Sequence, residues 1–167
     1  FVLARLPQPP SIDFISVGQG DATLVRHRGE YGLIDAGPPS SGWQLARTLR
    51  RLGVRDLKVL VITHGHSDHY SGLAHLLSQY AIARVVWNGR SMIDPQLQRL
   101  REQTENKGTL WHIATKEVMH IGDVVLRIMP SANAINVSEN NASIATHLEY
   151  RGSKVLLTGD LELTGEL

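Results

Sequence analysis

The sequence predicts a mixed α/β (α+β) fold in which two sheets are sandwiched between helices. Segments with strand character alternate with segments of helical periodicity, and meanders stand at the front and the back of the chain. A length of 167 residues suits one domain with a real hydrophobic core. We therefore expect the chemistry of the protein to lie at strand ends and on loops.

The expected strands follow from short apolar runs. Runs that end at Gly turns indicate an antiparallel meander at the start of the chain. The nearly all-apolar, β-branched run at 57–63 is typical of a strand covered on both faces. In chain order we expect strands at 12–17, 22–26, 32–37, 57–63, 82–87, 110–113 and 124–129, and a final hairpin of 143–150 and 154–158 about Arg151-Gly152.

The expected helices follow from apolar spacing and from capping residues. Trp43, Ala46, Leu49 and Leu52 recur at helical spacing, and Gly53 is the expected stop, which predicts one amphipathic helix. Two further helices are expected, one after His69 that includes Leu73, Leu76 and Leu77, and one from the cap Asp94-Pro95 to about Asn106. Residues 1–11 are expected to be a tail or linker, because three prolines within 7–10 break helix and strand alike, and 12–167 is expected to be the domain.

The composition excludes some classes of protein and leaves others open. The formal net charge is +1, so no global field would attract a polyanion, and we interpret the arginines at 47–55 as a solvated helix face. The absence of cysteine removes disulfides and thiolate zinc sites. No apolar run approaches the roughly 20 residues of a membrane span, and the first ten residues lack the pattern of a signal peptide. Localisation and oligomeric state stay open.

One short stretch concentrates the chemistry of the chain. Residues 63–69, THGHSDH, place three imidazoles and one carboxylate straight after the apolar run at 57–62. His64 and His66 alternate along the extended end of the strand and can point to the same side. Asp68 and His69 lie where a helix begins and can reach a second point, while Gly65 gives the backbone a tight path.

Such ligands suit divalent metal ions. A metal bound by imidazole and carboxylate acidifies its water and supplies a hydroxide near neutral pH, and two ions about 3.5–4 Å apart can clamp a phosphoryl or acyl oxygen. Four ligand-type side chains within six positions have no structural reason to end a buried strand. The stretch therefore predicts a metal-dependent hydrolase.

Five segments, in chain order, resemble one family. HGHSDH at 64–69 resembles the HxHxDH signature of the metallo-β-lactamase superfamily. SVGQGDA at 16–22 resembles the DVGQGDA turn of its ComEC-type branch, named for the hydrolase domain of the bacterial competence DNA-uptake channel. LIDAG, NNAS and LLTGDLE, at 33–37, 140–143 and 156–162, resemble its LIDxG, NNxS and LLTGDxE segments. The resemblance implies a four-layer αββα sandwich.

The resemblance also implies a set of ligands by position. His64 and His66 would bind one metal ion, Asp68 and His69 a second, and Asp160 would bridge both. Asp68 would in addition orient the attacking hydroxide, which makes it the implied catalytic residue. Two divalent ions are therefore expected, with zinc favoured and manganese or iron open.

Four further residues are expected near the centre. Asp35 is interpreted as support for ligand orientation, whereas Asp21 fits that role and a turn carboxylate equally well. Asn141 and Ser143 are candidates for polar groups near the substrate, although a turn before a strand explains them almost as well.

The sequence departs from the pattern of the branch in two places. Ser16 stands where the branch usually has Asp, and the usual His-His-Gly-Ser segment after TGD would lie beyond residue 167, so we expect the second half of the fold to be incomplete. His147 is interpreted as a strand residue rather than a ligand. The remaining histidines are expected at the surface: His27, His75, His112 and His120.

The leading functional hypothesis is a dinuclear metal hydrolase. It would be a phosphodiesterase or nuclease that acts on DNA or another phosphodiester through a metal-bridging hydroxide. Hydrolysis of another ester, such as a lactone, thioester or phosphocholine ester, is the second hypothesis, because fold does not fix substrate. A non-catalytic metal-binding domain is the third.

Overall fold

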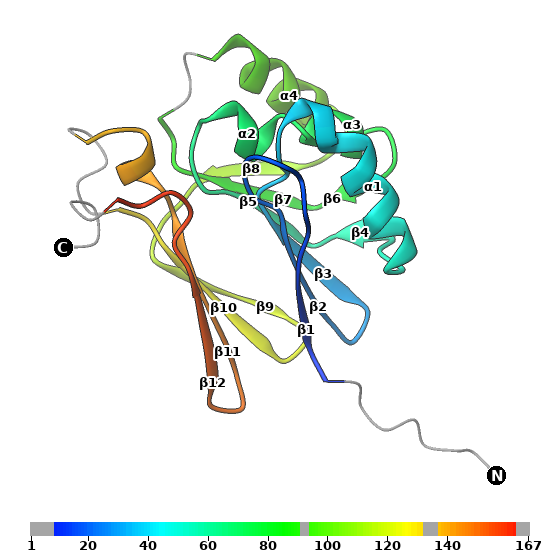
Figure 1. The fold of residues 1–167 in the computed structure, drawn as a ribbon, viewed down its shortest axis with the longest axis vertical. Helices are drawn as coiled ribbons and strands as arrows, with labels where there is room; N and C mark the ends of the chain where they lie inside the picture. Colours follow the sequence, from blue (N-terminus) through cyan, green and yellow to red (C-terminus); the bar gives the residue numbers. More distant parts are fainter. Residues whose placement is uncertain (1–8, 91–93, 132–136, 163–167) are drawn as a thin grey trace.

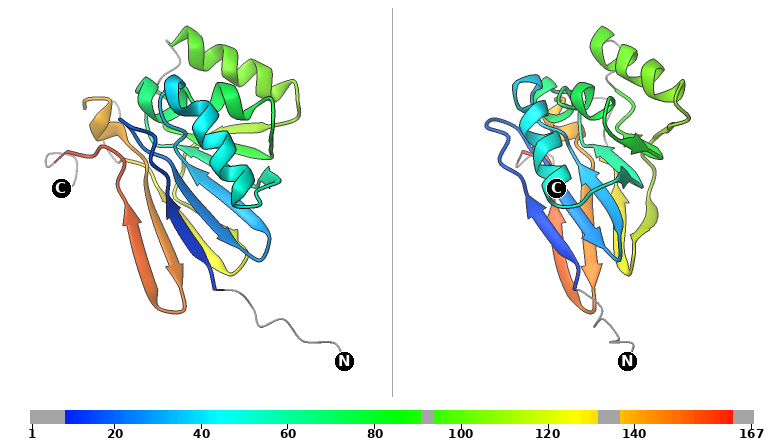
Figure 2. Two further views of the ribbon diagram at one scale, coloured as in Figure 1. Left: turned by 45° about the vertical axis from the view of Figure 1, so that its right-hand side comes forward. Right: turned by 90° about the vertical axis from the view of Figure 1, so that its right-hand side faces the viewer.

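The computed structural model describes residues 9–90, 94–131 and 137–162. Two sheets stack face to face, and the helices lie on the outer side of one of them (Figure 1). The described residues thus supply three layers of the expected four-layer sandwich, and within those ranges no helix covers the outer face of the other sheet (Figure 2).

The larger sheet combines a meander with parallel strands. Its order is β1-β2-β3-β5-β7-β8, with antiparallel pairing from β1 to β3 and parallel pairing from β3 to β8. The carboxyl ends of the parallel strands lie on the same side of the sheet, which is where ligands bind in sheets of this kind. The bounds are β1 (Ser11–Phe14), β2 (Thr23–His27), β3 (Glu30–Ile34), β5 (Val59–Ile62), β7 (Arg84–Trp87) and β8 (Leu110–Ile113).

The smaller sheet is antiparallel, with the order β12-β11-β10-β9. Its hairpin turns at Arg151-Gly152, as the sequence predicts, and both residues adopt positive φ. The bounds are β9 (Glu117–Ile121), β10 (Val124–Met129), β11 (Ala145–Tyr150) and β12 (Ser153–Leu157). A separate two-stranded pair joins β4 (Asp56–Leu57) to β6 (Ala81–Ile82).

The helices cover one face of the larger sheet. Asp94 caps α4 as expected, because its Oδ1 accepts hydrogen bonds from the backbone N–H groups of Gln96 and Leu97. Figure 2 shows α1, α3 and α4 on the side away from the smaller sheet. The bounds are α1 (Gly42–Arg51), α2 (Ser67–Tyr70), α3 (Leu73–Leu76) and α4 (Pro95–Glu105), with 3-10 turns η1 (Pro39–Ser41) and η3 (Asn140–Ala142).

The core lies on both faces of the larger sheet, because side chains alternate along its strands. Leu33 and Leu60 join the cluster under the helices, whereas Ile34 and Val61 join the cluster between the two sheets. All four residues of β5 are buried, as expected for a strand covered on both faces.

Several expected elements differ in detail. The strand expected at 57–63 is divided, because Leu57 pairs with β6 rather than extending β5. The helix expected after His69 is broken into α2 and α3 at Gly72, where a Cβ atom would lie 2.0 Å from the backbone oxygen of Ala36. Strand β9 had no clear sequence signal and was not expected.

Two residues lie in environments that the sequence analysis gets wrong. Trp43 is 69% exposed, and Leu45 takes its place on the buried face of α1. His27 is 3% exposed rather than at the surface, because it lies between the sheets, where its Nδ1 accepts a hydrogen bond from the N–H of Asp123. His75 and His112 are half-buried, and His120 is exposed as expected.

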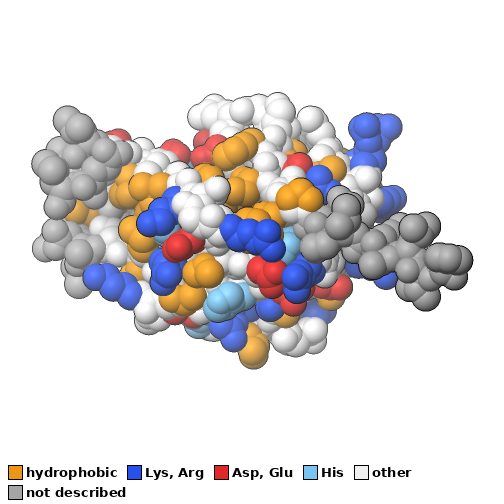
Figure 3. All heavy atoms as spheres, turned by 90° about the horizontal axis from the view of Figure 1, so that it is seen from below, with side chains coloured by type: hydrophobic (Ala, Val, Ile, Leu, Met, Phe, Trp, Pro, Cys, Tyr) orange, Lys and Arg blue, Asp and Glu red, His pale blue; other side chains and the backbone are white. Residues whose placement is uncertain are grey.

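The lower end of the molecule carries charges of both signs. Figure 3 shows Lys and Arg side chains there beside Asp and Glu side chains. Arg28 pairs with Asp123 at 2.9 Å and Lys58 pairs with Glu30 at 2.6 Å. Among the described helices, none combines the length and the apolar character that crossing a membrane requires.

Replacing Leu60 by Ala should lower the free energy of unfolding by about 2–5 kcal/mol, because the cavity forms in a close-packed core. The matched control is Leu110→Ala on the edge strand β8, where the side chain is 64% exposed and the change should stay within about 0.5 kcal/mol. Chemical denaturation of the three proteins measures the difference. Equal losses in the two variants would contradict the assigned core.

Candidate metal centre

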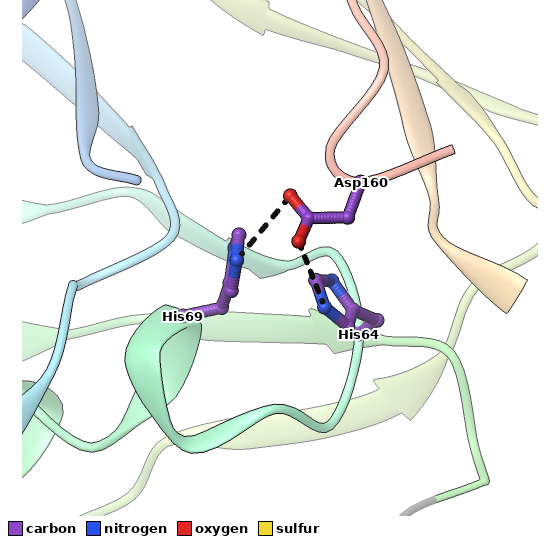
Figure 4. A group of neighbouring side chains, drawn as sticks. All are labelled: His64, His69 and Asp160. Atoms are coloured by element: carbon purple, nitrogen blue, oxygen red, sulfur yellow. Dashed lines mark ion pairs between the residues drawn. The ribbon is translucent and has the colours of Figure 1, made fainter. Parts of the chain in front are cut away.

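The candidate centre forms where the turn after β5 meets the turn after β12. His64 follows β5, His69 lies in α2, and Asp160 reaches toward both from the far turn (Figure 4). His64 Nε2 is 3.8 Å from one carboxylate oxygen of Asp160, and His69 Nε2 is 3.4 Å from the other. Both histidines are buried and Asp160 is 38% exposed, so the centre opens to solvent on the side of the carboxylate.

The donor atoms are spaced as ligands of shared ions. His66 adds a third imidazole, whose Nδ1 lies 3.1 Å from His64 Nε2. Two ligands at about 2.0–2.1 Å from one tetrahedral zinc ion lie about 3.4 Å from each other. The distances of 3.1, 3.4 and 3.8 Å between the ligand atoms lie around that value, so the residues fit a divalent metal.

Thr63 and Asp35 fix the tautomer of His64. The Thr63 hydroxyl donates to Asp35 Oδ2 at 2.7 Å, and the Thr63 N–H donates to Asp35 Oδ1 at 2.8 Å. Because its hydrogen is used in this way, the hydroxyl oxygen is left to accept from His64 Nδ1 at 3.1 Å. The lone pair of His64 is therefore on Nε2, which faces Asp160.

Asp35 orients His69 in the same manner. His69 Nδ1 donates to Asp35 Oδ2 at 2.9 Å, which turns Nε2 toward Asp160. Asp35 is only 1% exposed and holds φ at +58°, a region that non-glycine residues seldom occupy. Strain of this kind persists where the surrounding structure demands it.

The two buried histidines differ in protonation. Burial, followed by the charge of His69, lowers the pKa of His64 to about 4, so this imidazole is neutral and able to bind metal at pH 7. Burial alone would lower the pKa of His69, but the hydrogen bond and charge of Asp35 raise it to about 9. Burial raises the pKa of the Asp35 carboxyl in turn, against the lowering effect of its hydrogen bond with His69.

Two glycines permit the close approach of the turns. A Cβ atom on Gly159, where φ is +57°, would lie 3.1 Å from the side chain of Thr63. A Cβ atom on Gly20, where φ is +87°, would lie 2.0 Å from the backbone oxygen of Asp68. The GQGD and TGD segments therefore pack on the histidine turn because they lack side chains at these points.

The structure brings some of the expected site residues together and leaves others apart. His64, His69 and Asp160 form one group with ligand atoms within 4.8 Å of one another, and Asp21, Asp35 and His69 form another. Asp68 is half-buried, His66 is exposed, and both lie outside the two groups within the described ranges. The metal roles of the five expected ligands, the catalytic role of Asp68 and the supporting roles of Asp35 and Asp21 stay predictions.

Asn141 and Ser143 lie beside the centre but have structural surroundings. Asn141 is buried, and its side chain accepts from the N–H of Glu162 at 2.9 Å and donates to that carboxylate at 3.2 Å. Ser143 is fully buried, and its Oγ has no hydrogen-bond partner among the described residues. Their proximity to substrate stays a prediction. His147 is half-buried in β11 and outside both ligand groups.

Sequence reasoning missed two residues that form hydrogen bonds with the turn at 64–66. Thr63 was quoted within the turn without a role, although a hydroxyl between a buried strand and the first histidine is a usable signal. Glu139 accepts a hydrogen bond from the N–H of Gly65 at 2.8 Å across 74 positions of sequence, and no local pattern marks it.

Comparisons with known proteins agree with this geometry. The family model of the metallo-beta-lactamase superfamily matches residues 15–167. ComE operon protein 3 of Bacillus subtilis (strain 168) is 26% identical over 185 residues, which covers 99% of this chain and 24% of that protein. Ribonuclease Z of Clostridioides difficile (strain 630) is 37% identical over 57 residues, which covers 34% of this chain and 18% of that protein. The chain thus spans about a quarter or less of the length of these two relatives.

A solved structure shares the fold. A metallo-beta-lactamase of Cronobacter sakazakii with a HARLDQ motif aligns with a TM-score of 0.67 at 18% identity, covering 95% of this chain and 61% of that one. At this identity the likeness concerns the fold alone.

Replacing Asp35 by Asn in the metal-free protein should lower the pKa of His69 from about 9, because the carboxylate that accepts from Nδ1 is lost. A folded-state pKa above the unfolded value of about 6.5 stabilises the protein below that pH, and this stabilisation is lost as pH rises through about 9. NMR titration of the imidazole and denaturation against pH measure both effects.

The control for this variant is Asp123→Asn, which removes a surface partner of Arg28 away from the centre. It should leave the pKa of His69 unchanged. A pKa of about 9 that persists in Asp35→Asn would show that the pair does not set the protonation of His69.

Proposed function

Because this chain belongs to the metallo-beta-lactamase superfamily, in its ComEC-like branch, we propose that it is a dinuclear metal-dependent hydrolase acting as a phosphodiesterase or nuclease. The observation that carries the proposal is the position of Asp160, whose two oxygens face the Nε2 atoms of His64 and His69 separately. A carboxylate placed in this way suits a ligand that joins two ions.

The proposed ligand set is the one that the family resemblance implies. His64, His66, Asp68, His69 and Asp160 would hold two divalent ions, with zinc favoured as the metal. When bound, the ions acidify water near neutral pH and neutralise charge that develops on phosphoryl oxygens.

Residues of the chain orient the two imidazole rings and set their protonation. Thr63 and Asp35 hold the rings of His64 and His69 so that both Nε2 atoms face the centre. His64 is a neutral ring at pH 7, whereas His69 is protonated and would have to lose its Nε2 proton to hold an ion. Asp68, in the first turn of α2, is proposed to orient the attacking water.

Nucleic acid is the proposed substrate class. One relative is named ribonuclease Z, and another, from Neisseria gonorrhoeae, is named competence protein ComA. The near-zero net charge of the chain favours recognition of the phosphodiester at the centre itself rather than through a general positive field. The same ligands would serve a lactone, a thioester or a phosphocholine ester, so these remain the alternative substrates.

Replacing His64 by Ala should lower phosphodiesterase activity by more than about 100-fold, because a direct ligand contributes more than the outer groups whose loss costs 10–100-fold. The measurement is cleavage of single-stranded and double-stranded nucleic acid and of a chromogenic phosphodiester by zinc-loaded and manganese-loaded protein. The matched control is His120→Ala, an exposed histidine on β9, which should retain full activity.

The result decides between the proposals. The protein could be inactive on all phosphodiesters and yet cleave a lactone, a thioester or a phosphocholine ester. If His64→Ala abolished that cleavage, the substrate would be another ester. Inactivity on every ester, with less than one metal ion per chain by elemental analysis, would favour a non-catalytic domain.

A further inference from the structure

A short segment touches both halves of the candidate centre. We propose that residues 138–142, which include η3 and are called the clamp segment below, set the distance between the histidine turn and Asp160. Glu139 and Asn141 are its positioning residues. The inference rests on the proposed metal centre, and it assigns a task to residues outside the proposed ligand set.

One end of the clamp segment holds the histidine turn. Glu139 Oε1 accepts the backbone N–H of Gly65 at 2.8 Å. Gly65 lies between His64 and His66, so the orientation of its peptide unit directs both imidazoles. The Glu139 side chain is 24% exposed, which makes this charge-assisted hydrogen bond partly shielded from water.

The other end holds the turn of Asp160. Asn141 accepts from the backbone N–H of Glu162 at 2.9 Å and donates to its carboxylate at 3.2 Å. Asn140 donates to the second oxygen of that carboxylate at 3.2 Å. Because Glu162 lies two positions after Asp160, these three hydrogen bonds fix the path of the chain through Asp160.

The clamp segment is itself anchored to the larger sheet. Asn88, directly after β7, donates to Glu139 Oε1 at 3.1 Å and to the backbone oxygen of Ala142 at 3.3 Å. Arg90 donates to the backbone oxygens of Val137 and Ser138 at 2.8 and 3.0 Å. Since β7 pairs with β5, the segment and the histidine turn share one rigid base.

The ion pair with Arg90 does not by itself account for the position of the Glu139 side chain. The Arg90 Nε atom lies 3.9 Å from Glu139 Oε2, and partly exposed pairs of that length contribute little to stability. The shorter contact joins Glu139 to the backbone of the metal-binding turn.

The spacing that the clamp segment controls matters because His64 and Asp160 lie in turns that follow strands of different sheets. Their ligand atoms are 3.8 Å apart, close to the roughly 3.4 Å that one tetrahedral ion accepts. Supporting contacts of this kind change metal affinity by about 10–100-fold when they are lost.

The test is zinc affinity, measured by competition with a chromogenic chelator, with stoichiometry from elemental analysis. Glu139→Ala and Asn141→Ala should each weaken zinc binding by about 10–100-fold. Glu139→Gln keeps an acceptor oxygen for Gly65 and should recover most of the affinity. The double variant Glu139→Ala/Asn141→Ala should lose less than the product of the two single losses, because both act through one segment.

The matched control is Glu149→Ala, which removes a half-buried carboxylate paired with Arg127 at 3.5 Å on the smaller sheet. It should keep the zinc affinity of the unchanged protein. If Glu139→Ala does not fold, the zinc affinity of Asn141→Ala tests the inference by itself, because Asn141 acts on the same segment from the other end.

Two results would overturn the inference, and they are distinguishable. Zinc affinities of Glu139→Ala and Asn141→Ala equal to that of Glu149→Ala would reject the clamp and leave the metal centre standing. Absence of zinc binding by the unchanged protein would reject the metal centre and the clamp with it.

Discussion

The buried carboxylate of Asp35 is the constraint on which the centre depends. A carboxylate in such a place is costly unless donors surround it, and the N–H and hydroxyl of Thr63 and the ring of His69 supply them. These bonds tie the end of β3 to the end of β5 and to α2. The same bonds select the nitrogen that each histidine presents, so structural and chemical roles coincide in one residue.

The arrangement of the sheets explains how distant segments meet. The parallel strands β3, β5 and β7 end at one edge and bring together the residues that follow them, which are Asp35, Thr63 and Asn88. The smaller sheet delivers Asp160 to the same edge by way of Gly159, which packs on Thr63. The packed interface between the sheets therefore determines how closely Asp160 approaches the histidines.

The sequence predicts what local patterns encode. The cap at Asp94, the turn at Arg151-Gly152 and the fully buried β5 each follow from adjacent residues, and the family resemblance correctly implies the fold. Packing decides the rest. Trp43 is exposed because Leu45 faces the sheet, and His27 is buried because a second sheet covers it. The contact from Glu139 to the histidine turn depends on two loops that meet only in the folded chain.

The opposite protonation of His64 and His69 follows from the same geometry. Both rings are buried, yet only His69 contacts the carboxylate directly, whereas Thr63 stands between that carboxylate and His64. The intervening hydroxyl orients the ring of His64 but carries no charge. Burial therefore dominates the pKa of His64, whereas the ion pair with Asp35 dominates the pKa of His69. The protonated ring of His69 therefore faces Asp160, with its Nε2 atom 3.4 Å from one carboxylate oxygen, and the two groups carry opposite charges.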